Sequence, residues 1–322
     1  MRRPAAHRHR GERGNPAAAS ETITYDQRFA GEIAALRERI AGWIAGCDPE
    51  IRPELEWQLL ADSKYFRPFT VFACYRAMHD TAIPIVAIES ALLIELFHNV
   101  SLVIDDIVDK SEHRRNRSTL HGKFGELVAF MTAGYIVADG FRLAASDPQL
   151  TDLFAELLKR LAVAECMQWR LRRTPLGVED WRKIAAEDTG SMFEIAACLG
   201  DRSQRLRNFG GLLGLLYHGC DDVADVRGAS ALGGGGVDDL RDGILTLPAA
   251  LAIRDAETAR VFADPADHQL PLLAHAFQTK IPEAEAYLDR IAEEARTEAR
   301  LFAPHPEGLF ALIDQTRQLS GR

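Results

Sequence analysis

The chain has 322 residues, 47% of them apolar, a net charge of −9 and five cysteines with no C-x-x-C pair among them. This length and composition support a large hydrophobic core, and the acidic balance argues against nucleic acid as the main partner. The cysteine usage indicates a cytoplasmic protein without a structural zinc site, and no uninterrupted apolar run is long enough for stable insertion into a membrane.

Residues 1–24 are predicted to be a disordered basic tail, because they are rich in Arg, Pro, Gly and Ala and lack the apolar stretch of a secretory signal. Residues 25–322 show no composition break or long linker and are predicted to form one all-α domain. The four glycines at 233–236 are predicted to form a mobile loop or a flexible connector. Helical apolar spacing is present in segments 29–45, 85–108, 127–145, 150–170, 181–199, 206–223, 246–254 and 281–302.

Two D-D-x-x-D clusters, each at the end of an apolar segment, are the main functional signal. Helical spacing brings the first and fifth positions of each cluster onto one face, where two carboxylates about 4 Å apart repel by roughly 4 kcal/mol at an effective dielectric of about 20. Divalent cations relieve this repulsion, and oxygen-only ligands favour Mg²⁺. A single cluster of this kind is usually a solvated acidic face, but the apolar flanks predict burial here. The candidate metal ligands are Asp105, Asp106, Asp109, Asp221, Asp222 and Asp225.

These clusters and the motifs around them resemble those of the trans-isoprenyl diphosphate synthases, or polyprenyl synthetases, over nearly all of residues 25–322. The first cluster precedes Arg114-Arg115, and the second precedes D-L-R-D-G at 239–243 and T-L-P at 246–248. The segment S-K-Y-F-R-P at 63–68 is similar to the family's G-G-K-x-x-R-P, with Asp62-Ser63 in place of the glycines. Glu95 and His98 resemble its E-x-x-H.

The resemblance implies an antiparallel bundle of about a dozen helices around a deep apolar cavity, in a homodimer. It also implies an allylic prenyl diphosphate held on about three Mg²⁺ ions between the clusters, whose carbocation alkylates isopentenyl diphosphate. Metals would stabilise the leaving diphosphate, and apolar walls would exclude water from the cation.

Several single residues take their expected roles from the same resemblance. Taken alone, each cation among them could be a surface residue, the threonine could bond the preceding helical turn, and a histidine could be a core residue. Lys64, Arg67, His98 and Arg115 would hold the homoallylic diphosphate, Arg114 would reach the allylic side, Thr189 would stabilise the cation, and His218 stands where a glutamine is usual.

The chain departs from the family at three lysine positions that commonly bind the allylic diphosphate, which are Asp188, Gly234 and Ile244 here. Their joint loss is worth on the order of 5 to 9 kcal/mol before compensation. Three functions are therefore compared: a prenyltransferase, a terpene cyclase on the same fold, and a non-catalytic partner subunit. The retained homoallylic residues favour the first over the second, and six intact aspartates argue against the third.

Product length is predicted from the segment that leads into the first cluster. Positions four and five residues before Asp105 are Ser101 and Val100, which are smaller than the aromatics of family members that stop at C15. Phe97 lies about one turn deeper and is the first large ring that a growing chain would meet, although it could equally pack in the core facing away. We expect a product or a substrate of about C20.

Overall fold

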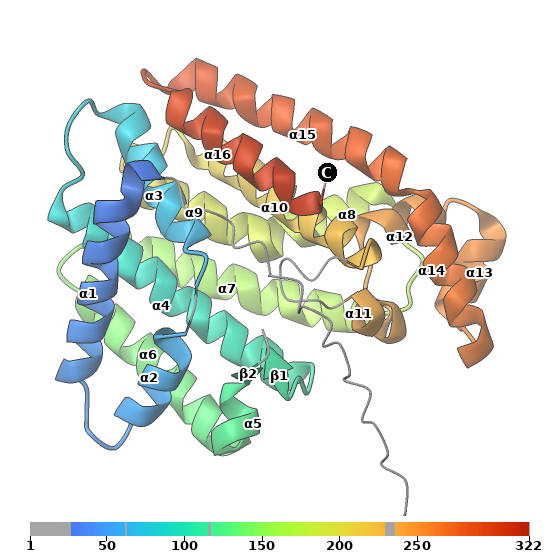
Figure 1. Ribbon diagram of the computed structural model, residues 1–322, viewed down its shortest axis with the longest axis horizontal. Helices are drawn as coiled ribbons and strands as arrows, with labels where there is room; N and C mark the ends of the chain where they lie inside the picture. The colour runs from blue at the N-terminus through green and yellow to red at the C-terminus, as the bar shows by residue number, and fades with distance from the viewer. Residues whose placement is uncertain (1–26, 62, 115–116, 229–235, 322) are drawn as a thin grey trace, which may run out of the picture.

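The protein is almost entirely helical in the computed structural model, which describes residues 27–61, 63–114, 117–228 and 236–321 (Figure 1). The expected all-α, single-domain fold is confirmed, and the expected disordered tail at 1–24 lies outside the described residues. Sixteen α-helices occur in the described ranges instead of about a dozen, because helices of five to eight residues connect the long ones.

The helices occupy the following positions. They are α1 (Ala30–Gly46), α2 (Arg52–Leu59), α3 (Phe66–Met78), α4 (Ile85–Val108), α5 (Leu120–Phe124), α6 (Glu126–Ala144), α7 (Pro148–Leu171), α8 (Val178–Ala185), α9 (Ser191–Gly200), α10 (Arg207–Val226), α11 (Gly236–Asp242), α12 (Leu247–Ala252), α13 (Ala256–Ala263), α14 (Leu270–Thr279), α15 (Ile281–Phe302) and α16 (Glu307–Arg317). The strands β1 (His113–Arg114) and β2 (Arg117–Ser118) form a short antiparallel ladder after α4.

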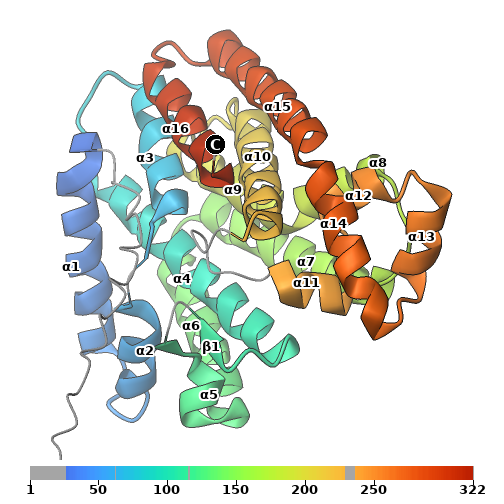
Figure 2. The ribbon, with the colours of Figure 1, turned by 45° about the vertical axis from the view of Figure 1, so that its right-hand side comes forward.

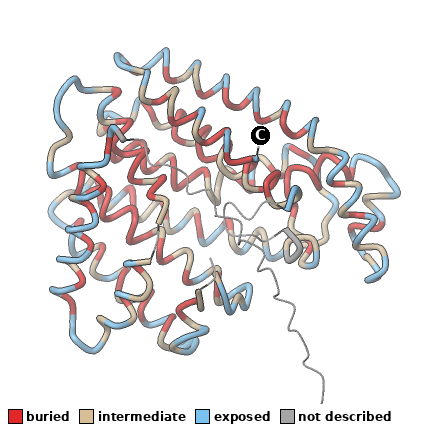
Figure 3. The backbone as a smooth tube through the Cα atoms, viewed as in Figure 1, coloured by how far each residue is buried: buried red, intermediate tan, exposed pale blue. Residues whose placement is uncertain are grey.

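The centre of the bundle consists of α3, α4, α9 and α10. Helix α9 packs against both α3 and α10, while α4 packs against α3 and α6. Helices α15 and α16 cover α10 on one side, and α1, α2 and α5 lie toward the opposite side, as the two views agree (Figures 1 and 2). The buried residues follow the facing sides of these central helices (Figure 3). The first aspartate cluster ends α4 and the second ends α10, so the core helices set where both clusters lie.

The segment expected as one helix at 181–199 is divided in the structure. It consists of α8, the five-residue π-helix η2 (Ala186–Gly190) and α9. A π turn widens the helix locally and re-aims the side chains that it carries, and such turns are frequent at functional sites. Here it carries Asp188 and Thr189. Gly236, expected in a loop, instead begins α11, while the rest of the glycine run lies outside the described residues.

Glycines bring the π-helix and α9 close to α10. A Cβ atom on Gly210 would lie 2.6 Å from the carbonyl oxygen of Phe193, and one on Gly214 would lie 2.9 Å from that of Thr189. No larger residue fits at either position without moving a backbone. Close approach of the two helices therefore depends on these glycines, and it places Thr189 beside the helix that ends in the second cluster.

Two described helices, α4 and α6, are long and apolar enough to cross a membrane by length and composition alone. The sequence expectation concerned uninterrupted apolar runs, whereas both helices contain polar residues, and the expected absence of stable membrane insertion stays a prediction. Within the bundle, 67% of the most apolar window of α4 is buried, against 33% for α6. The apolar character of α4 is explained by its place in the core, whereas α6 keeps a large exposed apolar face.

Candidate active site

The first aspartate cluster lies at the C-terminal end of α4, where its three carboxylates differ in exposure. Asp106 is buried, Asp105 is partly buried, and Asp109 is exposed at the position that follows the helix. The Nε of Arg114 donates a hydrogen bond to Oδ1 of Asp106 at 2.8 Å. Burial, followed by repulsion from Glu165 and Asp188, raises the pKa of Asp105 well above its usual range.

The second cluster lies at the end of α10 and is fixed through Asp222. Its Oδ2 accepts hydrogen bonds from the indole Nε1 of Trp181 and from the backbone N–H of Leu247, both at 2.8 Å. Trp181 belongs to α8 and Leu247 begins α12, so two further helices converge on this carboxylate. Oδ2 of Asp222 therefore has a structural role, and Oδ1 is the oxygen that could bind a ligand.

Carboxylates of both clusters act on the same region. Burial and the neighbouring Asp222 raise the pKa of Asp221 to about 6, even though His218, Lys64 and Arg114 oppose that rise. Burial, then Asp222, Asp225, Asp221 and Asp109, raises the pKa of Asp239 in α11 to about 8. Because acids of both clusters raise the pKa of Asp239, both clusters lie within electrostatic range of this one carboxyl group.

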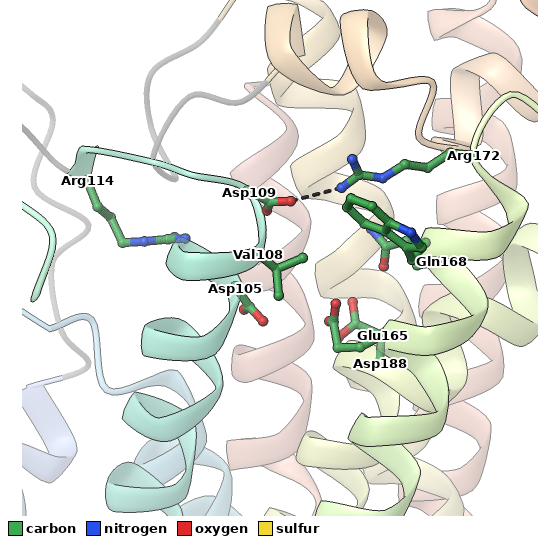
Figure 4. A pocket seen from close by; sticks show the side chains of 9 residues that line it. Asp105, Val108, Asp109, Arg114, Glu165, Gln168, Arg172 and Asp188 are labelled. Carbon is green, nitrogen blue, oxygen red and sulfur yellow. Dashed lines mark hydrogen bonds and ion pairs between the residues drawn. The ribbon is translucent and has the colours of Figure 1, made fainter. Parts of the chain in front are cut away.

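A pocket of about 150 Å³ opens between α4 and α7 beside the first cluster (Figure 4). Asp105 and Asp109 line one side, and Glu165 and Asp188 project from the other side. Burial, then repulsion from Asp188 and Asp109, raises the pKa of Glu165 to about 7. Val108, Arg114, Gln168, Trp169 and Arg172 complete the lining.

Thr189 and His218 connect the π-helix to the second cluster. The hydroxyl of Thr189 lies 2.9 Å from Nδ1 of His218, and Nε2 of the same ring lies 3.8 Å from Oδ1 of Asp222. Asp188 is the third neighbour, with its Oδ2 at 3.3 Å from the Thr189 hydroxyl and at 3.5 Å from Nδ1 of His218. The departure from lysine at 188 thus places a carboxylate beside both Thr189 and His218.

Two of the expected homoallylic residues, Lys64 and Arg67, lie on the α3 side of the second cluster. Ser63 donates a hydrogen bond to Glu95 of α4 at 2.8 Å and so docks the segment that carries Lys64, whose charge lowers the pKa of Asp221. Arg67 donates from Nε to the sulfur of Met192 at 3.1 Å, and its guanidinium lies over the rings of Phe193 and Tyr217. His98 is partly buried in α4, seven residues before Asp105, while Arg115 lies outside the described residues.

The residues from which product length is predicted all lie on α4. Phe97 is fully buried; it stacks on Phe154 of α7 with ring centroids 4.5 Å apart and meets Phe141 of α6 edge-on at 5.5 Å. Val100 is buried too, and the hydroxyl of Ser101 donates to the carbonyl of His98 at 2.8 Å. Phe97 therefore packs toward α6 and α7. Helix α7 also lines the acidic pocket.

The donor set fits Mg²⁺ in its chemistry. In the described parts of the chain, no three His, Cys, Asp or Glu side chains converge tightly enough to enclose an ion by themselves. Mg²⁺ is usually held by one or two carboxylates, with water and substrate phosphate in its other positions, so the clusters need not enclose it. The raised pKa values of Asp221 and Asp239 mark a site where an added cation would favour the ionised carboxylates.

Some residues of this site were not found from the sequence. Glu165, Trp169 and Arg172 lie in or just after the last turns of α7, and no spacing rule connects them to an aspartate cluster. Trp181 gave no functional signal either, because a tryptophan on a helical apolar stripe is most often a core residue. Only the packing of α7 and α8 against the cluster ends reveals their place.

Comparison with known proteins agrees with this geometry. The family model described as polyprenyl synthetase matches residues 50–269, and the chain belongs to this family. It is 28% identical to nonaprenyl diphosphate synthase of Mycobacterium tuberculosis, over 80% of this chain and 83% of that protein. It is 26% identical to octaprenyl diphosphate synthase of Escherichia coli, over 69% and 71% of the two chains. These relatives are named as prenyl diphosphate synthases, which are prenyltransferases, and the expected enzyme class is confirmed.

Solved structures show the same fold. The heptaprenyl diphosphate synthase of Staphylococcus aureus superposes with a TM-score of 0.81 at 21% identity, over 94% of this chain and 99% of that one. The decaprenyl diphosphate synthase of Rhodobacter capsulatus gives 0.80 at 23% identity, over 92% and 97%. The polyprenyl synthase of Caulobacter crescentus, solved with calcium and isoprenyl diphosphate, gives 0.78 at 23% identity, over 92% and 96%.

The raised pKa of Glu165 gives a testable pH dependence in the metal-free protein. A carboxyl whose pKa is raised by folding keeps its proton in the folded state at pH values where the unfolded chain has lost it, so stability falls as pH rises from about 4.3 toward about 7. Glu165→Gln should remove this penalty, raising Tm at pH 8 and leaving it nearly unchanged at pH 4. Thermal unfolding at both values measures the effect.

The matched control for this substitution is Glu38→Gln, which alters an exposed glutamate on α1. It should leave Tm within about one degree at both pH values, since isolated surface charges contribute little. Equal Tm for Glu165→Gln and the unaltered protein at pH 8 would show that the Glu165 carboxylate is not penalised in the fold.

Proposed function

We propose that the protein is a magnesium-dependent prenyl diphosphate synthase that condenses an allylic prenyl diphosphate with isopentenyl diphosphate to give a product of about C20. The observation that carries the proposal is the convergence of two aspartate clusters with cations from two other segments, since both Lys64 and Arg114 act on Asp221. The Caulobacter relative solved with a divalent cation and isoprenyl diphosphate supports the same chemistry.

Each part of the site has a separate task in this reaction. When bound, Mg²⁺ supplies the positive charge that stabilises the departing diphosphate. Asp105, Asp109, Asp221 and Oδ1 of Asp222 would hold the ions, while Lys64 and Arg67 would bind the second diphosphate. The allylic C–O bond breaks, the isopentenyl double bond attacks the cation, and the released diphosphate takes the proton that the new cation loses.

The apolar walls of the bundle protect the carbocation from water. The Thr189 hydroxyl is held by His218, so its oxygen lone pairs have a fixed direction at the wall formed by the π-helix. Fixed dipoles of this kind stabilise a developing positive charge without reorganising. The role of Thr189 in this proposal is therefore electrostatic and not acid–base.

Product analysis tests the proposed function. Purified protein with Mg²⁺ is incubated with C10, C15 and C20 allylic diphosphates, each with and without isopentenyl diphosphate, and the products are identified by mass. Elongation that requires isopentenyl diphosphate supports the proposal. Hydrocarbon or alcohol from the allylic substrate alone would identify a terpene cyclase, and no turnover under any condition would favour a non-catalytic partner subunit.

Metal dependence is the first prediction from this proposal. Asp105→Ala and Asp221→Ala should each lower kcat at least 100-fold while preserving the fold, because removing one of several repelling carboxylates costs little stability. The control Asp80→Ala alters an exposed aspartate between α3 and α4 and should keep full activity. Turnover that survives complete chelation by EDTA would contradict the metal mechanism.

The predicted product length depends on the ring cluster at Phe97. Phe97 lies eight residues before Asp105, roughly 12 Å along α4. Its stacking on Phe154 links α4 to α7 at this depth, below the acidic pocket that the same two helices enclose. A prenyl chain that starts at the first cluster and grows between these helices would meet this pair of rings. The relatives' names extend from geranylgeranyl to nonaprenyl, so length must be set by such local features.

Phe97→Ala should therefore lengthen the main product by one or more C5 units, as measured by mass spectrometry. Phe72→Ala is the matched control, because Phe72 is an equally buried ring in α3 that packs against Phe29. Both substitutions create a cavity and cost about 3 to 5 kcal/mol, but only the first should change product length. An unchanged product length in Phe97→Ala would show that Phe97 does not limit the length of the prenyl chain.

We also propose a homodimer that uses the exposed face of α6. Leu127, Phe130 and Met131 are 74%, 64% and 58% exposed and occur at i, i+3 and i+4, which forms one apolar stripe. Contiguous exposed apolar surface of this kind is typical of protein interfaces. A second copy is the occupant that we infer, since symmetric pairing of identical stripes needs no other partner.

The five free cysteines suit the reducing cytoplasm, which we propose as the location of the protein.

Light scattering on a sizing column tests the dimer. The unaltered protein should have twice the chain mass of 35.7 kDa, and the double substitution Leu127→Asp, Phe130→Asp should shift it to the monomer. Leu272→Asp alters an exposed leucine on α14 and should leave the dimer intact. A monomeric unaltered protein at micromolar concentration would overturn the inference.

A further inference from the structure

Arg172 joins the two halves of the candidate site. It directly follows α7, and its Nη2 donates a hydrogen bond to Oδ1 of Asp109 at 2.9 Å (Figure 4). Its Nη1 lies 3.5 Å from Oδ2 of Asp242 in α11, the helix that follows the second cluster. One guanidinium therefore bridges an acid of the first cluster to an acid beyond the second, at the edge of the pocket.

The guanidinium is held in place but incompletely bonded. Its central carbon lies 4.4 Å from the ring centroid of Trp169, and the side chain is 21% exposed. The Nε of Arg172 is buried and has no hydrogen-bond partner among the described residues. An unpaired buried donor is costly, and a ligand that accepted a hydrogen bond from it would recover that cost.

The direction of the unpaired Nε–H of Arg172 indicates which kind of ligand it could bind. Nε–H and one N–H of Nη2 point the same way from one edge of the planar guanidinium, which is the edge that binds carboxylate or phosphate with two parallel hydrogen bonds. Asp109 accepts at Nη2 only and leaves Nε unused. A phosphate group at this edge would satisfy both donors at once.

The side chains that line the pocket carry more acidic than basic groups, so an added cation would balance their charge. Four acids, Asp105, Asp109, Glu165 and Asp188, line it, against two arginines. Arg114 is hydrogen-bonded to buried Asp106. Two of the family's diphosphate-binding lysine positions are Asp188 and Ile244 here, and neither side chain can donate to phosphate as a cation.

We propose that Arg172 is a substrate-binding residue that holds the allylic diphosphate in place of the absent lysines. This inference rests on the proposed function. Oδ1 of Asp109 accepts a hydrogen bond from Nη2 of Arg172 in the structure. If Asp109 held a metal ion instead, Nη2 would be able to donate together with Nε to the diphosphate. The Trp169 ring keeps the guanidinium at the pocket edge during this exchange of partners.

Equilibrium binding tests the inference independently of turnover. The probe is an unreactive thiolo analogue of geranylgeranyl diphosphate with excess Mg²⁺, titrated by calorimetry into the full chain. Loss of a charged, two-point hydrogen bond in Arg172→Ala should weaken binding about 10- to 100-fold. Isopentenyl diphosphate, titrated separately, should bind with less than a threefold change. Arg172→Lys, which keeps the charge but loses the planar fork, should fall between Arg172→Ala and the unaltered protein.

Arg170→Ala is the matched control. Arg170 is an exposed arginine in the last turn of α7, and its Nε donates to the carbonyl of Cys166 in the preceding turn. It should bind the analogue normally. In turnover assays, Arg172→Ala should raise KM for the allylic substrate and leave KM for isopentenyl diphosphate nearly unchanged. A residue that merely supports Asp109 would lower Tm and kcat without this split between substrates.

The outcomes separate the two proposals. Analogue binding by the unaltered protein but equal binding by Arg172→Ala would overturn the role of Arg172 and leave the proposed function intact. No binding by the unaltered protein would overturn both. If Arg172→Ala fails to fold, Arg172→Gln supplies the measurement, since it keeps the first part of the side chain and a polar end while it removes the guanidinium.

Discussion

Mutual repulsion among buried carboxylates is the constraint on which the site depends. Two core helices, α4 and α10, end in aspartate clusters that the fold brings into one poorly solvated region. The consequence is visible at Asp221 and Asp239, whose pKa values rise to about 6 and about 8 through burial and acidic neighbours. Such an arrangement costs free energy in the metal-free chain, and the surrounding core must supply the stability that holds it together.

The α8, π-helix and α9 region shows how the core does this. Gly210 and Gly214 let α10 approach the backbone of the π-helix and α9 closely, and the π turn sets Thr189 against His218. Trp181 in α8 then fixes Asp222 from the side. Packing geometry and electrostatics are therefore coupled: the glycine contacts set Thr189 beside His218, and α8 supplies the indole donor that orients Asp222.

The sequence predicts most of this fold because its long amphipathic and apolar helices carry clear signals. Helices α4 and α15 have the bounds that spacing predicts, Ile85–Val108 and Ile281–Phe302. Helix α3 is absent from the segments predicted by apolar spacing because nine of its 13 residues are buried, which leaves little polar face to mark a period. The π turn and the α7 side of the pocket could not be predicted, since a one-residue widening and a contact between α4 and α7 leave no local pattern in the chain.

Two sets of residues between α4 and α7 carry the unusual features of the chain. In the acidic pocket, Glu165 and Asp188 add negative charge beside the first cluster, while Arg172 offers an incompletely bonded guanidinium. Deeper in the bundle, Phe97 and Phe154 stack on each other. In the function that we propose, the pocket acts on the diphosphate and the stacked rings act on the hydrocarbon tail. Because Phe97 and Asp105 are separated by about two helical turns, affinity for the head group and length of the tail can change independently. The proposed function is therefore compatible with the loss of lysines at the head-group site.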